Sequence, residues 1–126
     1  GAPAGMMTDG RPVSNGELAV VARRLIQRRR LRDSILGPTL LAEPGWDILL
    51  ELMLAELKGT QLSKSVIGFE AAIPTTTALR WIQRLEEEGL VEHSRDPRDR
   101  RRSFVRLTSQ GSAQMQRFLS MIATSL

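Results

Sequence analysis

The chain has 126 residues, and its 18 basic and 14 acidic side chains give a net charge of +4 at neutral pH. This length fits one domain with one hydrophobic core, and the basic balance favours a polyanionic partner. The absence of cysteine excludes disulfide frameworks, thiolate metal sites and redox-sensing thiols. No apolar run approaches the ~18 residues that a membrane-spanning helix needs, so we expect a cytoplasmic protein.

The N-terminal region divides into a tail and a helix. Residues 1–13 are predicted to be a disordered tail, and its first three residues are expected to be a cloning remnant. Ser14 and Glu17 have the spacing of a capping box, which predicts a helix over residues 16–32 within an N-terminal segment of residues 14–43. The apolar stripe of this helix must pack either on the rest of the chain or on another subunit; it consists of Leu18, Val21, Ala22 and Leu25.

A second helix is predicted over residues 44–58, at the start of a core unit that spans residues 44–108. Proline suits its first turn, and Lys58-Gly59 supplies the cation and the glycine that commonly end a helix. Asp47 and Glu51 lie on a narrow polar strip, so we expect this helix to be buried on most sides. Its apolar positions follow the helical repeat and include Trp46, Leu49, Leu50, Met53, Leu54 and Leu57.

Two further helices with a tight turn between them form a helix-turn-helix pattern. Ser63 is the predicted N-cap of a short helix that stops near Glu70, and Pro74 opens a helix that reaches about Glu88 before Gly89. We expect the core face of the second helix to hold Ala78, Leu79, Ile82 and Leu85. Its opposite face carries base-reading and phosphate-reading residue types, or is an ordinary polar face; it holds Thr76, Thr77, Arg80, Gln83 and Arg84.

The remaining chain predicts a hairpin and a last helix. Residues 90–93 and 103–107 have strand character, and the run between them, SRDPRDRRR, is predicted to form the turn. Such a run is either a solvated face or a binding surface, and Asp99 is placed to pair with a neighbouring arginine. Residues 109–126 predict a helix with apolar residues at helical spacing: Met115, Phe118, Leu119 and Ile122.

This order of elements, with RLEEEGLV at residues 84–91, DPRDRR at 96–101 and VRLTSQG at 105–111, resembles the MarR family of bacterial winged helix-turn-helix regulators. The resemblance implies a mainly α (α+β) fold, with a two-stranded wing and with dimerisation helices at both ends of the chain. It also implies a homodimer on a pseudo-palindromic operator of double-stranded DNA, with recognition helix 74–88 in the major groove and wing 94–103 in the minor groove. In this picture Asp99 orients Arg101 into the minor groove, where arginine is favoured by the negative potential.

The residues expected to take part follow from the pattern and the resemblance together. The predicted DNA-binding residues are Ser63, Pro74, Thr75, Thr76, Thr77, Arg80, Arg84, Arg95, Arg98, Asp99, Arg100, Arg101 and Arg102. The predicted dimerisation residues are Leu18, Val21, Leu25, Phe118, Leu119 and Ile122. Typical members of the family have a further helix after the wing, and their effector pocket usually lies between the dimerisation and DNA-binding parts. Because only one helix is predicted after the wing here, a small-molecule effector is left open.

Other classes of function have less support in the sequence. His93 is the only histidine, and the chain has no cysteine and no glycine-rich phosphate loop, so we expect neither an enzyme nor a cofactor nor a metal site. Residues 86–88 are three glutamates near His93, and they are read as a solvated helix end rather than as metal ligands. The alternative to DNA binding is a winged helix that contacts another protein.

Overall fold

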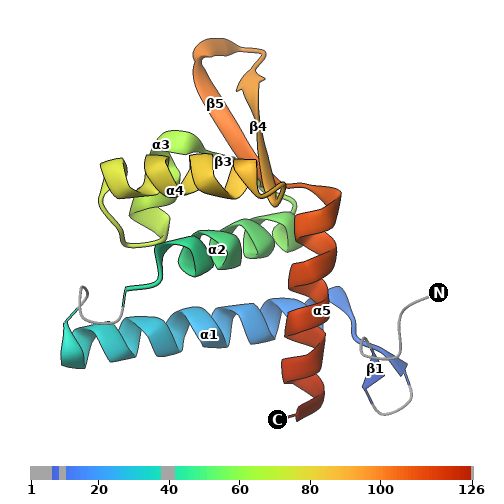
Figure 1. The fold of residues 1–126 in the computed structure, drawn as a ribbon. Coiled ribbons are helices and arrows are strands. Elements are labelled where there is room, and N and C mark those ends of the chain that lie inside the picture. The colour runs from blue at the N-terminus through green and yellow to red at the C-terminus, as the bar shows by residue number, and fades with distance from the viewer. Residues whose placement is uncertain (1–6, 9–10, 38–41, 126) are drawn as a thin grey trace.

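The computed structural model describes residues 7–8, 11–37 and 42–125 and arranges them around a central helix (Figure 1). This helix, α2 (Pro44–Lys58), lies between the long helix α1 (Asn15–Leu36) and the pair formed by α3 (Lys64–Glu70) and α4 (Thr75–Glu87). Helix α5 (Ser109–Ser125) packs across α1 and α2. The mainly helical winged helix-turn-helix fold predicted from the sequence is confirmed.

A small antiparallel sheet carries the wing. Strands β4 (Val91–Asp96) and β5 (Asp99–Leu107) form the hairpin that projects beyond α4, and the short strand β3 (Leu62–Ser63) pairs with the other edge of β5. The predicted strands were too short, because the arginine run is not a loop: only residues 97–98 form the turn. Strand β3 was missed, since a two-residue strand gives no alternating pattern in the sequence.

Helix α1 begins as predicted and ends later than predicted. The Ser14 hydroxyl oxygen accepts a hydrogen bond from the Glu17 amide at 3.1 Å, and the Glu17 carboxylate accepts one from the Ser14 amide at 3.5 Å, so the capping box is confirmed. The helix runs to Leu36 rather than to residue 32, because no glycine or proline interrupts it before Gly37. Residues 38–41 of the predicted linker lie outside the described residues.

The apolar stripe of α1 packs inside the chain. Leu18, Val21 and Ala22 are buried in one hydrophobic core, and Leu119 of α5 is buried in the same core. Burial of this kind stabilises the fold by ~1.5–3 kcal/mol for each large aliphatic side chain. The prediction that Leu18, Val21 and Leu119 dimerise is therefore wrong, because α2 and α5 of the same chain already cover them.

The other three predicted dimerisation residues have partly accessible side chains. Leu25 and Ile122 are half-buried and pack against the edge of the core. Phe118 is 46% exposed, and its ring meets the ring of Trp46 edge-on at a centroid distance of 5.1 Å. These three residues stay candidates for contact with a second subunit.

Helices α1 and α2 also share a buried ion cluster that the sequence analysis did not predict. Arg29 lies with its Nη1 atom 3.3 Å from Asp47 Oδ1 and its Nη2 atom 3.8 Å from Glu51 Oε1, and all three side chains are buried. The three guanidinium nitrogens have no hydrogen-bond partner among the described residues. Burial raises the pKa of Asp47 and Glu51, and the charge of Arg29 opposes this increase. Asp47 and Glu51 therefore belong to an interior contact rather than to a solvated strip.

The turn between α3 and α4 brings the two helices close together. A Cβ atom at Gly68 would lie 3.1 Å from the Ile73 carbonyl oxygen and 3.4 Å from Ala78 Cβ, so a residue without a side chain suits this crossing. Ala72 lies in the turn at φ 57°, a left-handed conformation that is unusual for alanine. Together these features fix the angle at which α4 leaves the turn.

Part of the N-terminal tail is ordered. Strands β1 (Met7–Thr8) and β2 (Arg11–Pro12) pair antiparallel, and β1 contacts α5. The predicted disorder of residues 1–13 is therefore wrong for these four residues. Residues 9–10 lie outside the described residues. Within the part of the chain that is described, no helix has both the length and the apolar character to cross a membrane.

Candidate nucleic-acid interface

Helix α4 presents a row of polar side chains to solvent. Pro74 is the N-cap residue, and the helix buries Ala78, Ile82 and Leu85 against the core. Because the helix turns by ~100° per residue, the residues between these positions point away from the core. Those that are exposed include Thr75, Thr76, Arg80, Gln83 and Arg84, and Thr77 is half-buried.

Two side chains at the borders of this face differ from the prediction. Leu79 was expected to dock on the core, but it is 42% exposed, because it lies ~100° around the helix from Ala78 and outside the arc that α2 and α3 cover. Arg84 lies on the opposite border, with its guanidinium 4.9 Å from the centroid of the Trp81 ring. This cation–π contact fixes Arg84 at the side of the helix and leaves Arg80 at the centre of the polar face.

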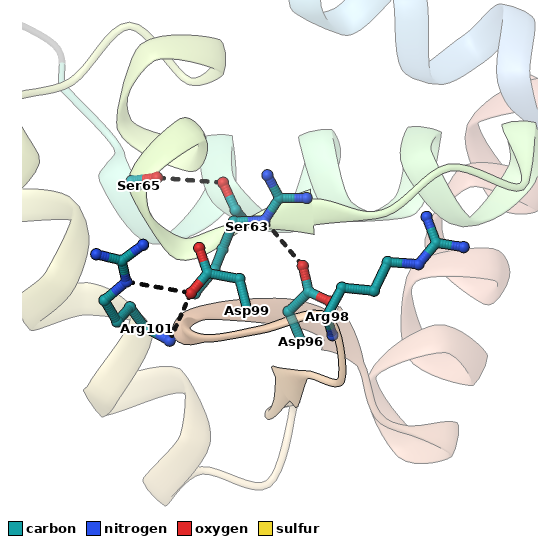
Figure 2. Close-up of polar contacts among 7 residues, drawn as sticks. Ser63, Ser65, Asp96, Arg98, Asp99 and Arg101 are labelled. Atoms are coloured by element: carbon teal, nitrogen blue, oxygen red, sulfur yellow. Dashed lines mark hydrogen bonds and ion pairs between the residues drawn. The ribbon is translucent and has the colours of Figure 1, made fainter.

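The tip of the wing holds one arginine in a defined orientation. Asp99 Oδ1 accepts hydrogen bonds from the Arg101 backbone amide at 3.0 Å and from Arg101 Nε at 3.3 Å, as Figure 2 shows. The Arg101 side chain is nevertheless 92% exposed. An arginine held in this way projects its remaining donors into solvent without internal competition for them. The predicted pairing of Asp99 with Arg101 is therefore present.

A second aspartate holds the turn of the wing. Asp96 is buried, and its carboxylate accepts a hydrogen bond from the Arg98 amide at 2.8 Å and lies 3.3 Å from Arg102 Nε. The guanidinium of Arg102 also lies 5.1 Å from the centroid of the Phe104 ring. Arg102 therefore stabilises the hairpin, and its predicted contact with DNA stays a prediction. The side chain of Arg98 leaves the turn in another direction from that of Arg101 (Figure 2).

Three more arginines of the wing are exposed. Arg95, Arg98 and Arg100 have no acidic partner within 4 Å among the described residues. At the base of the wing the charges are paired, since Arg106 Nε lies 2.8 Å from Glu92 Oε1. Unpaired cations therefore concentrate at the tip of the hairpin, which is the part that projects furthest from the core.

One predicted contact residue is not accessible. Ser63 is buried, since its backbone pairs with Phe104 in the sheet, and its hydroxyl lies 3.2 Å from the Ser65 hydroxyl (Figure 2). Ser63 does precede α3 as its N-cap residue, but its side chain makes no capping hydrogen bond. The prediction that Ser63 contacts DNA is wrong, and the exposed Ser65 is better placed.

A cleft separates the helix-turn-helix from the wing. It has a volume of about 390 Å³, and it brings together side chains from α3, α4 and β5. Its lining residues are Lys64, Ser65, Thr75, Leu79, Asp99, Arg101, Arg102 and Ser103. Lys64, Ser65 and Leu79 were not predicted as site residues, because the sequence pattern gives no indication that β5 folds back over the start of α3.

The glutamates at the end of α4 do not form a metal site in the described residues. Glu86 Oε1 lies 2.8 Å from His93 Nδ1, which links the end of α4 to β4. No group of three or more potential ligand side chains comes together in the part of the chain that the structure describes. The arrangement is a polar contact that supports the base of the wing.

Comparison with known proteins agrees with this geometry. A family profile described as a winged helix DNA-binding domain matches residues 54–111, which include the end of α2, the helix-turn-helix and the wing. The structure resembles the PcaV transcriptional regulator from Streptomyces coelicolor in complex with its natural ligand, with 29% sequence identity and a TM-score of 0.54 over 82% of this chain and 70% of PcaV. This chain therefore contains a winged helix DNA-binding domain and is similar to a transcriptional regulator.

More distant structures share the fold. The S. aureus MepR–DNA complex is 17% identical, with a TM-score of 0.58 over 82% of this chain and 79% of MepR. A protein described as a probable transcriptional regulator from Pseudomonas aeruginosa is 24% identical, with a TM-score of 0.55 over 83% of this chain and 76% of that protein. A search of curated protein sequences finds no match. The fold of this chain therefore recurs in proteins whose sequences have diverged widely.

Proposed function

We propose that this chain is a regulator of the MarR family that binds a pseudo-palindromic operator in double-stranded DNA as a homodimer. Helix α4 enters the major groove, and the wing tip follows the adjacent minor groove. The observation that carries this proposal is Arg101, which Asp99 orients and which is almost fully exposed at the tip of the hairpin. A narrow minor groove concentrates negative potential and favours an inserted arginine.

The other charged and polar groups have distinct roles in this arrangement. Arg80 lies at the centre of the exposed face of α4 and is the candidate for reading a base edge, since arginine bonds guanine through two donors. Arg95, Arg98 and Arg100 contact phosphates, which gives affinity without sequence preference. The predicted contacts of Pro74, Thr75, Thr76, Thr77, Arg84 and Arg102 stay part of the proposal as supporting contacts at the edges of the interface.

The homodimer uses apolar side chains that the single chain leaves accessible. Phe118 and Met121 of α5 are 46% and 52% exposed, and Val20 of α1 is 43% exposed. Leu25 and Ile122, which are half-buried, complete the set. Exposed apolar groups on two packed helices suit a self-complementary interface with two-fold symmetry. Two-fold symmetry of the protein in turn requires an inverted repeat in the operator.

A small-molecule effector is a further part of the proposal. A cavity of about 200 Å³ lies between α1 and α2 beside the guanidinium of Arg29, and Trp46 is part of its wall. The guanidinium groups of Arg28, Arg29 and Arg32 line this cavity against two carboxylates, and this excess of positive charge beside an aromatic ring suits a small aromatic carboxylate. The similarity to PcaV, whose structure contains its natural ligand, supports a ligand for this chain but does not indicate its chemistry. Quenching of tryptophan fluorescence by benzoate-type carboxylates in the wild type, and its loss in Trp46→Phe, is the expected outcome.

Selection from randomised duplex DNA tests the proposal directly. At near-physiological salt, specific sites are expected to bind at least about a thousandfold more tightly than random sequence. The expected result is an inverted repeat with half-sites about one helical turn apart, because the two α4 helices of a dimer enter successive major grooves. Arg80→Ala is expected to relax the base preference at one position of each half-site. If no sequence is enriched, the DNA-reading proposal fails, and a winged helix that contacts another protein becomes the better explanation.

A protein that acts on bacterial DNA works in the cytoplasm, which is where we expect it.

A further inference from the structure

Leu79 is an apolar side chain in a position where helix α4 is otherwise polar. It is 42% exposed, whereas Ala78 and Ile82 of the same helix are completely buried. On a helical projection Leu79 lies between the core face and the face that carries Arg80. Because it lines the same cleft as residues of β5, it lies on the side of α4 that faces the wing.

The surroundings of Leu79 determine what can occupy the cleft. Lys64 and Ser65 lie on one side, Arg101 and Arg102 on the other, and Thr75 lies one turn before Leu79 on α4. The three cations exceed the single carboxylate of Asp99, so the cleft attracts an anion rather than an apolar peptide. Its occupant must nevertheless offer an apolar group to Leu79.

Duplex DNA combines both properties in one strand. Its phosphates match the cations, and thymine projects a 5-methyl group into the major groove, where it is the one apolar feature that distinguishes a base pair. A helix in the major groove with a wing over the adjacent backbone places a DNA strand between the two elements. The DNA strand that passes through this cleft therefore presents the major-groove edges of its bases to the side of α4 that faces the wing.

We propose that Leu79 is a specificity-determining residue that contacts the 5-methyl group of a thymine at one position of each half-site. This inference rests on the proposed function, since it requires α4 to enter the major groove. Leu79 supplies the preference for thymine by removing the methyl group from water, while Lys64 and Arg102 in the wall of the cleft contact the DNA backbone. Arg80, which is the next residue of the helix, reads a different base.

The experiment uses the selected operator with single thymines replaced by deoxyuridine, which lacks only the 5-methyl group. One thymine in one half-site is expected to be sensitive, with a loss of affinity of about fourfold for the wild type, the factor that corresponds to the ~0.8 kcal/mol of one buried methyl-sized group. In Leu79→Ala the same replacement is expected to change the affinity by less than about 1.5-fold, on the order of 0.2 kcal/mol. Leu79→Met, which keeps an apolar side chain of similar volume, is expected to keep the discrimination.

A matched control is Leu36→Ala, which removes the same atoms from a leucine that is 52% exposed on α1, on the other side of α2 from α4. It is expected to bind both operators as the wild type does. If deoxyuridine has the same effect on the wild type and on Leu79→Ala, or has no effect at any position, the role of Leu79 is refuted although the operator stands. If no operator is selected at all, the proposed function itself fails, and the two failures are thereby distinguished.

Discussion

Replacement of Arg29 by methionine is expected to destabilise the protein in a manner that depends on pH. The arginine is buried between α1 and α2, 3.3 Å from Asp47 and 3.8 Å from Glu51. Methionine has a similar length and fits the same apolar surroundings, so the change removes the positive charge with little loss of volume. It leaves two buried carboxylates without their cation, which is the costly way to alter a buried ion cluster.

The magnitude follows from the protonation of the two carboxyl groups. At neutral pH, loss of one partner of a buried ion pair costs ~3–5 kcal/mol. At pH ~3 both carboxyl groups are protonated, and the cost is expected to fall to ~1 kcal/mol, the value of a lost polar contact. A chain of this size has a stability of ~5–15 kcal/mol, so the variant is expected to stay folded and measurable in acid and neutral solution.

The sign of the pH dependence follows from the direction of the pKa shifts. Burial raises the pKa of Asp47 above its usual value of 3.8 and that of Glu51 above 4.5, and Arg29 lowers both. A raised pKa means that the carboxyl group binds protons more strongly in the folded state than in the unfolded state. The contribution of these two groups to the free energy of unfolding is therefore greatest below their usual pKa values and falls as the pH rises through their folded pKa values. Arg29→Met raises these pKa values further, and the loss of stability therefore extends to higher pH, at up to ~1.4 kcal/mol per pH unit for each group.

Urea unfolding at a series of pH values from about 3 to 8 measures this effect. The difference between the wild type and Arg29→Met is expected to grow as the pH rises and to level off once both carboxyl groups are ionised. Arg28→Met is the matched control, because Arg28 is exposed and is expected to change the stability by less than ~0.5 kcal/mol at any pH. A triple variant that adds Asp47→Asn and Glu51→Gln is expected to recover most of the loss. A cost for Arg29→Met that is the same at every pH would refute the ion-cluster explanation.

Three further predictions concern the wing, the dimer and the base of α5. Arg101→Ala is expected to weaken operator binding by ~1–3 kcal/mol per subunit and to lower the slope of log affinity against log salt concentration by about one per subunit. Binding titrations at several salt concentrations would measure both effects, and an unchanged slope would argue against a phosphate-rich environment for this side chain. Phe118→Glu is expected to lower the mass measured in sedimentation from that of a dimer towards that of a monomer. Gln114→Glu introduces the same charge at an exposed site of α5 and is expected to leave the mass unchanged, so equal masses for the two variants would show that the interface lies elsewhere. Gly111→Ala is expected to cost ~1–3 kcal/mol of folding stability in urea unfolding, because the added Cβ atom would overlap the Leu90 carbonyl group; wild-type stability would show that the backbone there moves freely.

The sequence predicted most of the helical elements because their signals are local. The capping box of Ser14 and Glu17, Gly59 after α2 and Pro74 before α4 each act within one or two turns of the chain. The spacing of Ala78, Ile82 and Leu85 likewise depends only on the period of a helix. These signals predicted the start of the first helix and the bounds of α2 and α4 to within about two residues.

The sequence did not predict features that depend on contacts between distant segments. Strand β3 exists because residues 62–63 lie beside β5, which is about 40 residues further along the chain. The burial of Ser63 and the exposure of Leu79 both follow from where the wing lies relative to the helix-turn-helix. The same limit applies to Leu18 and Leu119, since an apolar stripe is identical in sequence whether its own chain or a second subunit covers it.

The two aspartates of the run SRDPRDRRR explain how the hairpin accommodates so many arginines. The buried Asp96 uses its carboxylate to fix the turn and to hold Arg102, so one guanidinium stabilises the hairpin from within. The exposed Asp99 fixes the direction of Arg101 without covering it. The run therefore contains both the cations that an anionic partner requires and the carboxylates that give the cations a fixed geometry, which lowers the entropy lost when the partner binds. A wing with the same net charge but without these two aspartates would attract DNA as strongly from a distance and hold it less specifically at contact.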